Sequence, residues 1–324
     1  MSGGAATIRR MIQDLLTAAA HGDYDAIGEL EKVAAAGPDR LAPHLHQLLD
    51  LGILWPPTLF RAADSGVVQR VIDRVDCGRH DADLNRLLLV LAHTRDPLAE
   101  AAFRRWSAVP PPGTDKLHVG PLEYAKQGGW TLHPDGTRRE LCGPVAYRLI
   151  PIAAPQVAGG APCPWCGSPL WPILNLDTDD PRAAQALAHT GWQGRLRITT
   201  CSLCACYTTL YSRVTPDGGS VWSPHNSPPS YLPRSTEDPP ALLPTIGEPR
   251  ATPYQASAWD EGGSTLGGHP QWIQDAEHAD CAACGQPMDY VALVGGADLD
   301  FGEGAYYLQL HAPCGLAAVC YQQS

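Results

Sequence analysis

The sequence predicts an α+β protein of several domains, in which an N-terminal helical domain precedes a β-rich region with two zinc-ribbon-like units. Three observations predict this fold class. Apolar residues recur at helical spacing over roughly the first third of the chain, shorter alternating runs follow, and two sets of paired metal-ligand residues lie among those runs. The chain has 324 residues, enough for two or three domains, and its 44% hydrophobic content is ample for packed cores.

Residues 1–107 form the predicted helical domain. Ile8, Ile12 and Leu15 recur at i, i+4 and i+7, which places them on one face of a first helix. Helical spacing continues in five further runs, at 24–33, 41–49, 59–63, 67–75 and 84–92. Asp96 followed by Pro97 is a strong start for a last helix. Short helices with brief connections predict either stacked hairpins similar to HEAT or armadillo arrays, or an irregular bundle.

Residues 108–215 are predicted to hold a β-hairpin and the first zinc ribbon. The runs 130–133 and 137–141 alternate around a Pro-Asp-Gly turn that favours a positive φ at Gly136. Further strands are expected in four runs, at 145–152, 170–176, 195–200 and 207–214. A short helix is expected at 182–189, because Asp180 and Pro181 provide an N-cap and a first helical residue.

Two pairs of cysteines predict a metal site in the first ribbon. Cys163 and Cys166 form one pair, and Cys201 and Cys204 form the second. Spacing of two residues within each pair lets one tight turn direct both thiolates at a single ion, and four thiolates complete a tetrahedral zinc site. Cys206 adjoins the second pair and is an alternative ligand there.

A second zinc site is predicted in residues 251–324, the second ribbon. Cys281 and Cys284 form its first pair, and His311 and Cys314 its second. Both sites begin with Cys-x-x-Cys-Gly-x-Pro, in which glycine permits the positive φ of a metal knuckle and proline directs the chain into a strand. We therefore interpret the two ribbons as an internal repeat that holds two structural zinc ions.

Other interpretations of these residues are weaker. A redox pair of thioredoxin type would have to begin a helix, and Gly167, Ser168 and Pro169 prevent one after Cys166. Disulfides are disfavoured because the N-terminal residues lack the apolar core of a secretory signal, so we expect a cytoplasmic protein. No apolar run approaches the roughly 20 residues of a membrane span. Cys77 and His80 also have ligand spacing, but no second pair accompanies them and a loop is favoured.

Residues 216–250 are predicted to lack regular structure. They contain nine prolines together with Ser, Gly and Asp. The segment is either a free linker or an ordered arm anchored by Trp222 and Tyr231.

Charge indicates the kind of partner. The formal net charge is −11, and residues 251–324 contain nine carboxylates with no Lys or Arg. Nucleic-acid affinity depends on cations placed against phosphates, so this segment disfavours nucleic acid and favours a basic protein as partner. The sequence shows no P-loop, nucleophile elbow, His-Glu-x-x-His motif or dinucleotide fingerprint. We therefore expect no enzymatic activity.

A family resemblance supports this interpretation. Residues 266–274 read LGGHPQWIQ, the second Cys-x-x-Cys-Gly-x-Pro follows, and Ala-Val-Cys-Tyr-Gln closes the run. This pattern resembles the C-terminal part of bacterial YwqG-like domains and, more distantly, the C-terminal domain of the programmed cell death protein 2 family. The resemblance implies a β-rich, non-enzymatic protein that holds a basic partner, either as an immunity protein or as a chaperone. His311 stands where those relatives often carry cysteine.

The function predicted from the sequence is thus a zinc-binding protein-interaction module. One alternative is a nucleic-acid-associated zinc-ribbon protein, for which Arg195, Arg197 and Arg213 are the best support. The other is a hydrolase that uses Asp or His residues scattered in the β region.

Overall fold

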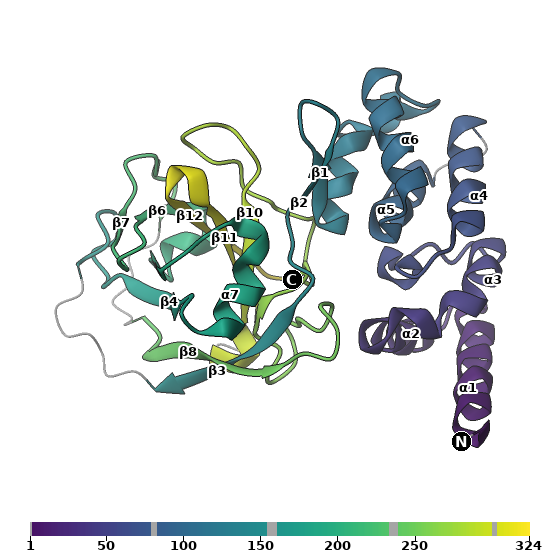
Figure 1. Ribbon diagram of the computed structural model, residues 1–324, viewed down its shortest axis with the longest axis horizontal. Coiled ribbons are helices and arrows are strands. Elements are labelled where there is room, and N and C mark those ends of the chain that lie inside the picture. Colours follow the sequence, from purple (N-terminus) through teal and green to yellow (C-terminus); the bar gives the residue numbers. More distant parts are fainter. Residues whose placement is uncertain (1, 79–82, 154–160, 233–238, 300–302) are drawn as a thin grey trace. The chain divides into compact units, whose positions relative to one another are not determined.

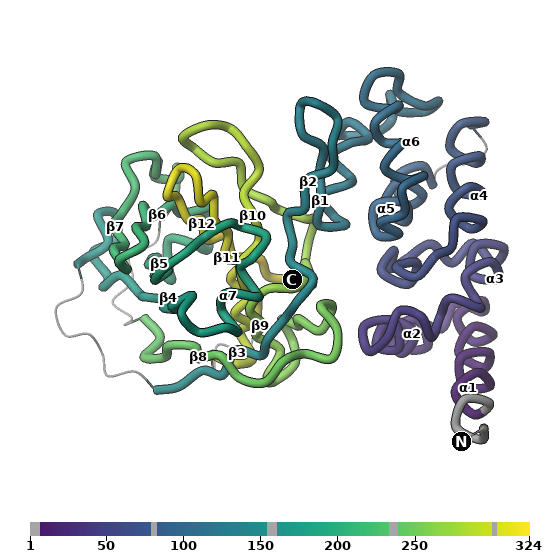
Figure 2. The backbone as a smooth tube through the Cα atoms, viewed as in Figure 1, coloured from purple at the N-terminus to yellow at the C-terminus, as the bar shows by residue number. Residues whose placement is uncertain are grey.

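A computed structural model describes residues 2–78, 83–153, 161–232, 239–299 and 303–324. The chain divides into two compact units, Met1–Arg139 and Glu140–Ser324. The first unit is mainly helical and the second is mainly β, as Figure 1 shows and as the backbone trace in Figure 2 follows. The predicted fold class is therefore confirmed.

The first unit consists of α-helices joined by 3-10 turns. The helices are α1 (Ser2–Ala20), α2 (Tyr24–Ala36), α3 (Leu45–Asp50), α4 (Ser65–Asp76), α5 (Leu84–Thr94) and α6 (Pro97–Ala108). The 3-10 turns are η1 (Pro38–Arg40), η2 (Ala42–His44), η3 (Pro57–Phe60), η4 (Thr114–Lys116) and η5 (Pro121–Gly128). The run 59–63, for which a helix was expected, lies mostly in turn η3 and the residues after it, because Pro56 and Pro57 interrupt the preceding backbone hydrogen bonds.

Aspartate caps and apolar stripes explain these helices. The carboxylates of Asp23, Asp64 and Asp96 accept hydrogen bonds from backbone N–H groups at the starts of α2, α4 and α6. In α4, Val67, Val71 and Val75 lie one turn apart and are all buried. These side chains join one core that extends from α1 to a buried tryptophan, Trp130.

A hairpin that follows the helices belongs to the same unit. It consists of β1 (Trp130–Leu132) and β2 (Arg138–Glu140), and Gly136 in its turn has the expected positive φ of 81°. The Trp130 ring packs edge-on against Phe103 at 5.5 Å between centroids, and its Nε1 donates to the Ala92 carbonyl at 2.9 Å. The expected domain boundary at 107/108 is therefore wrong. The boundary lies at 139/140, because the tryptophan is buried in the helical core.

The second unit is organised around an eight-stranded sheet. Its strands are β3 (Ala146–Ala153), β6 (Leu210–Val214), β7 (Ser220–Trp222), β8 (Leu242–Pro249), β9 (Thr265–Gly267), β10 (Asp289–Gly295), β11 (Ala305–His311) and β12 (Leu316–Gln322). They lie in the order β7-β6-β12-β11-β10-β9-β3-β8. A separate two-stranded sheet pairs β4 (Trp171–Asp177) with β5 (Arg195–Thr200), and helix α7 (Pro181–Leu187) lies between these two strands in the chain.

The large sheet is buried on both faces at its centre. Every residue of β10 and β11 is buried. Alternate side chains such as Tyr306 and Leu308 join the core formed with β4, β5 and α7. Tyr307 instead joins a second cluster, which the segment 256–273 covers with Trp272 and Ile273. The central strands therefore read as continuous apolar runs rather than as alternating ones.

Two expectations for the domain organisation are wrong. Residues 216–250 do have regular structure, because they contain strands β7 and β8, and β8 pairs with β3 from Ala153↔Leu242 to Tyr147↔Pro249. Of the two alternatives, the free linker is therefore wrong and the ordered arm is observed, with Trp222 against Trp165 and Tyr231 against Tyr207. Nor are 108–215 and 251–324 separate domains, since β12 pairs with β6 and β9 pairs with β3. The physical reason is the same in both cases. Strand edges that a short ribbon would leave open obtain their hydrogen bonds from segments distant in the chain.

Candidate metal centres

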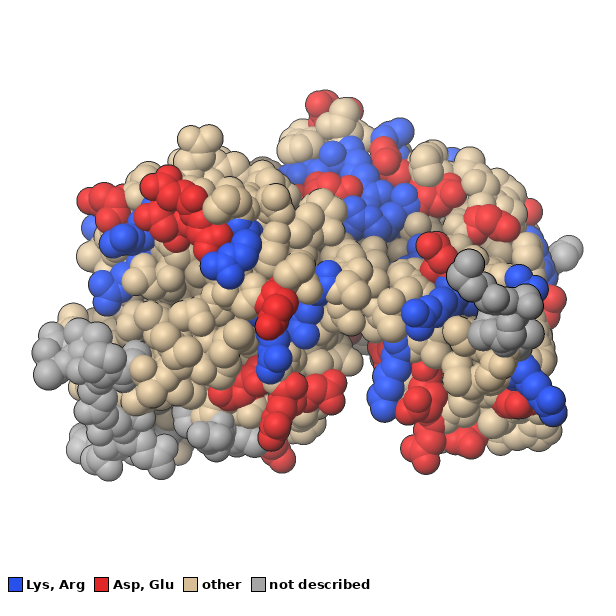
Figure 3. Space-filling model, turned by 60° about the horizontal axis from the view of Figure 1, so that its bottom comes forward, with Lys and Arg blue, Asp and Glu red and all other residues tan. Residues whose placement is uncertain are grey.

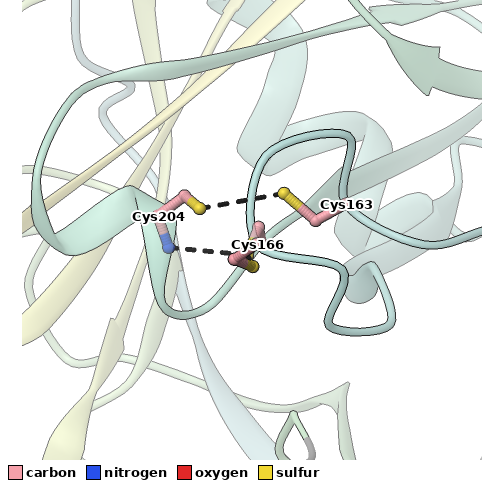
Figure 4. A group of neighbouring side chains, drawn as sticks. Cys163, Cys166 and Cys204 are labelled. Atoms are coloured by element: carbon pink, nitrogen blue, oxygen red, sulfur yellow. Dashed lines mark hydrogen bonds between the residues drawn. The ribbon is translucent and has the colours of Figure 1, made fainter. Parts of the chain in front are cut away.

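The first metal centre brings together the four cysteines that the sequence predicted. The thiol sulfurs of Cys163, Cys166, Cys201 and Cys204 all lie within 4.8 Å of one another. The Sγ atoms of Cys163 and Cys204 are 3.7 Å apart, and those of Cys166 and Cys201 are 3.5 Å apart. Cys163 lies on a loop opposite Cys204, and their thiols point toward each other (Figure 4).

These distances suit a tetrahedral ion and exclude disulfides. Metal–sulfur bonds of about 2.3 Å in a tetrahedron place the sulfurs about 3.8 Å apart, whereas a disulfide requires about 2.05 Å. None of the eleven cysteines, all of which lie in the described part of the chain, forms a disulfide. The donor set and its spacing therefore fit a bound metal ion.

The electrostatics of the first centre also favour a cation. The neighbouring thiol of Cys201 donates a hydrogen bond that lowers the pKa of Cys163 to about 5. The same interaction and burial raise the pKa of Cys201, and burial raises that of Cys204. One thiolate is thus favoured at the expense of its neighbours, because it accepts a thiol hydrogen bond and burial disfavours further negative charge. A divalent cation would balance the negative charge and allow all four thiols to ionise.

The second metal centre contains Cys281, Cys284, His311 and Cys314, whose ligand atoms also lie within 4.8 Å of one another. The Cys284 sulfur is 3.8 Å from Nδ1 of His311 and 3.9 Å from Nε2. In a tetrahedron with metal–sulfur and metal–nitrogen bonds of usual length, this separation is about 3.6 Å. The imidazole is therefore placed as a fourth ligand. Within the described residues, these two centres are the groups of Cys, His, Asp or Glu side chains that are arranged to hold a metal ion.

Both centres use the same backbone knuckle. In the first, the Cys163 N–H donates to the Ser168 carbonyl at 2.8 Å, and Gly167 N–H donates back to the Cys163 carbonyl at 3.0 Å. In the second, the Cys281 N–H donates to the Gln286 carbonyl and Gly285 N–H to the Cys281 carbonyl, both at 2.7 Å. Gly167 and Gly285 have positive φ values of 82° and 75°. Each glycine therefore has the conformation that the sequence pattern predicted.

The internal repeat extends from the knuckles into the strands. Trp171, eight residues after Cys163, pairs with Thr200, the residue before Cys201. Asp289, eight residues after Cys281, pairs likewise with Leu310, the residue before His311. The register shifts at the same position in both copies, between residues 172 and 174 and between 290 and 292. The two centres are therefore two copies of one unit.

Two positioning residues of the second centre were missed in the sequence. The buried Gln309 side chain accepts from the Ala279 N–H and donates to the Glu277 carbonyl, both at 2.7 Å. The Tyr211 hydroxyl donates to the Asp280 carbonyl at 3.0 Å. Both contacts hold the segment that enters the Cys281 knuckle. The signal for Gln309 was a single amide within the otherwise apolar strand YYLQLH.

Other cysteines considered from the sequence do not join a centre. The Cys206 thiol donates to the Ser202 carbonyl at 3.3 Å and is absent from the first cluster, which excludes it as an alternative ligand in this arrangement. Cys77 is exposed at the end of α4, and His80 lies outside the described residues. Cys142 and Cys320 are buried.

The glycine pair of the LGGHPQW run has a structural role. Gly267 and Gly268 have φ values of 69° and 67°. A Cβ on Gly267 would lie 2.5 Å from the Val145 carbonyl oxygen, and one on Gly268 would lie 2.4 Å from that of Pro253. Only glycine fits where strand β9 meets these two backbones. The LGGHPQW run therefore positions the segment that covers one face of the sheet, and it contributes no metal ligand.

Comparison with known proteins identifies a curated relative. It is "Uncharacterized protein YpfL" of Salmonella typhimurium, which is 31% identical over 282 residues. The match covers 83% of this chain and 65% of the relative, so the chain spans slightly less than two thirds of that protein's length. No family model matches the chain, and no solved structure matches it. No helix in the described residues has the length and apolar character needed to cross a membrane.

Proposed function

We propose that this is a non-enzymatic, cytoplasmic protein that binds two structural zinc ions and uses its β unit to hold a basic partner protein. The observation that carries the metal assignment is the donor set of the two centres. Three or four thiolates in tetrahedral spacing favour zinc over oxygen-preferring cations such as calcium or magnesium.

The coordination supports a structural role for both ions. Each centre offers four side-chain ligands, so a tetrahedral ion has no open position for water or substrate. Three ligands of the first centre, Cys163, Cys201 and Cys204, also belong to the main core of the β unit. An ion there joins the knuckles to that core, which is the arrangement expected of a structural metal.

Charge supports a basic partner. Residues 140–324 contain 17 Asp and Glu against seven Lys and Arg, whereas residues 1–139 are nearly balanced, with 17 against 16. Figure 3 shows acidic side chains in several groups on one face, with Lys and Arg side chains beside some of these groups. Asp275, Glu277 and Asp280 are exposed close to the second knuckle. Such a surface attracts a basic protein and repels nucleic acid.

The resemblance to YwqG-like domains is part of this proposal. It rests on residues 266–274, on the knuckle at 281–288 and on the closing run 318–322, and the glycine pair and the knuckle have the structural roles described above. An immunity protein and a chaperone are the two roles that the resemblance suggests, and both hold a basic partner.

A nucleic-acid-associated role is the second candidate. Tyr207 and Tyr231 form an exposed edge-on pair 6.3 Å apart between ring centroids, and Arg213 is exposed on β6. Exposed aromatic rings can stack on bases, and exposed cations can contact phosphates. The net negative charge of the β unit weighs against this role.

The proposal is tested in two steps with the full-length protein. Metal analysis after reconstitution should give two zinc ions per chain, and less than one would contradict the assignment of both centres. The tagged protein is then used to capture partners from its own cells, in parallel with the variant Asp275→Lys/Glu277→Lys/Asp280→Lys. We expect the wild type to capture a basic protein. High salt should release this partner, and the variant should not capture it. A matched variant, Asp14→Lys/Asp25→Lys/Asp39→Lys, changes the same charge on the helical unit and should retain the partner. An acidic partner, or nucleic acid bound at low salt, would contradict the proposal.

A further inference from the structure

The two metal centres differ in their exposure to solvent. In the first centre Cys163, Cys201 and Cys204 are 2%, 0% and 0% exposed, and Cys166 is half-buried. In the second centre Cys281 and His311 are buried, but the side chains of Cys284 and Cys314 are exposed. Two of the four ligand residues of the second centre are therefore exposed, whereas none of the first centre is.

The residues between the ligands explain this difference. Trp165 lies between the first two cysteines of the first centre and packs edge-on against Trp222 at 5.0 Å between centroids. Leu203, between the other two, packs against the main core. The corresponding positions of the second centre carry only Ala282, Ala283, Ala312 and Pro313. These side chains are too short to cover the ligands, and residues 282–286 are all exposed.

The apolar core behind the second centre is also smaller than the core behind the first. The ligands of the first centre lie in the largest apolar cluster of the β unit. Cys281 belongs to a small cluster with Ala279, Met288, Leu316 and Ala318. Loss of the second ion would therefore disturb few contacts, whereas loss of the first would open the main core.

We propose that the second centre is a thiol-oxidation site, at which a peroxide converts Cys284 and Cys314 into a disulfide and releases the metal while the first centre stays intact. This inference rests on the proposed function, because it requires that both centres hold zinc. It assigns to the second centre a reversible chemistry that a purely structural ion would not have.

The chemistry balances with hydrogen peroxide as the oxidant. One of the two exposed thiolates attacks a peroxide oxygen, the O–O bond breaks, and hydroxide leaves a sulfenic acid behind. The other thiolate attacks the sulfenic sulfur, an S–S bond forms, and a second hydroxide leaves. The two sulfurs lose two electrons, the peroxide gains two, and two protons from solvent convert the hydroxides into water.

The geometry favours this pairing of thiols. The Sγ atoms of Cys284 and Cys314 lie within 4.8 Å of each other and come from different knuckles, so the bond needs only a small movement of exposed turns. After oxidation only Cys281 and His311 would remain as ligands, and two ligands do not retain a tetrahedral zinc ion. Reduction of the disulfide restores the donor set.

The test uses full-length protein loaded with zinc and treated with increasing amounts of hydrogen peroxide. A zinc-binding dye reports the metal released, and mass spectrometry after thiol alkylation identifies the oxidised cysteines. We expect one of the two zinc equivalents to be released first, together with a Cys284–Cys314 disulfide. A reductant and added zinc should then restore two ions per chain.

Two variants test the physical cause. Ala283→Trp gives the second centre a tryptophan at the position that Trp165 occupies in the first centre. This variant should release its first zinc equivalent more slowly than the wild type. Trp165→Ala should allow peroxide to release the second equivalent as well. The position of Ala283 is exposed, so that variant remains informative even if Trp165→Ala fails to fold.

The outcomes separate the two proposals. Fewer than two zinc ions before oxidation would contradict the proposed function. Two ions released together, or first release from the Cys163 centre, would overturn the oxidation site and leave the zinc assignment intact. Release of one ion without a Cys284–Cys314 disulfide would also overturn it.

Discussion

His311 holds the place in the second metal centre that Cys201 holds in the first. His311 directly follows Leu310, which pairs with Asp289, eight residues after Cys281. Cys201 directly follows Thr200, which pairs with Trp171, eight residues after Cys163. The imidazole therefore replaces a thiolate without any change of strand register, and the two centres differ in their ligands while sharing one backbone design.

This equivalence predicts that His311→Cys retains the second metal ion. The new thiolate would face Cys284, which now lies 3.8 Å from Nδ1 of His311. His311→Ala should lose that ion, because three ligands with an open position hold a structural zinc less tightly. Metal analysis should give two ions per chain for the wild type and for His311→Cys, and one for His311→Ala. Loss of the ion from His311→Cys would show that the two positions are not equivalent.

The two centres should differ in their effect on stability. Cys201→Ser removes a ligand that is 0% exposed within the main core, so we expect the free energy of unfolding of the β unit to fall by about 3 kcal/mol or more. Cys314→Ser removes an exposed ligand and should cost about 1 kcal/mol. Urea unfolding of the zinc-loaded proteins, followed by tryptophan fluorescence, measures both values. Equal losses would contradict the difference in burial.

The glycine pair at the end of strand β9 should be intolerant of side chains. Gly268→Ala combines a φ of 67° with a Cβ placed 2.4 Å from the Pro253 carbonyl oxygen, so we expect a loss of about 3 kcal/mol or more. Gly285→Ala is the matched control, because its φ is 75° but no atom lies within 4 Å of the new Cβ. Only backbone strain of about 1–2 kcal/mol applies there. Thermal unfolding of the two variants should separate the effects, and similar losses would show that crowding is absent at Gly268.

The helical unit should lose stability in mild acid through His93. Burial, with the positive charges of Arg61 and Arg95 nearby, lowers the pKa of this imidazole to about 3. As pH falls below about 6.5, the imidazole of His93 binds a proton in the unfolded chain but stays neutral in the folded chain. The free energy of unfolding therefore decreases until pH approaches the pKa of the folded state. His93→Gln removes this titratable group, so the free energy of unfolding should depend less on pH between about 3 and 6.5. Urea midpoints measured across that range test it, and an unchanged slope would exclude His93 as the cause.

The candidate site could be predicted almost completely from the sequence. Metal ligands must lie on tight turns, so the spacing of Cys163 and Cys166, and of Cys281 and Cys284, already encodes the local geometry. The glycine after each pair identifies the positive φ of the knuckle. The helical runs were likewise local, because an apolar stripe and an aspartate cap are contained within one segment.

The domain organisation could not be predicted in this way. The proline content of residues 216–250 predicts an irregular segment. Residues 242–249 nevertheless pair with β3, a strand that lies almost a hundred residues earlier in the chain. Gln309 and Tyr211 position the second knuckle through contacts with segments that are distant in the chain. No local pattern contains such partners.

The sequence by itself determined the ligands of both centres, their common knuckle and the helical character of the first unit, because each depends on residues a few positions apart. Tertiary structure alone decided that β3 and β6 join the strands of the second ribbon in one sheet while β4 and β5 pair separately, that Trp130 belongs to the helical core, and that the two centres differ in exposure. These features depend on which strand edges and apolar surfaces meet, and hydrogen bonding and burial select those pairings only when the whole chain folds.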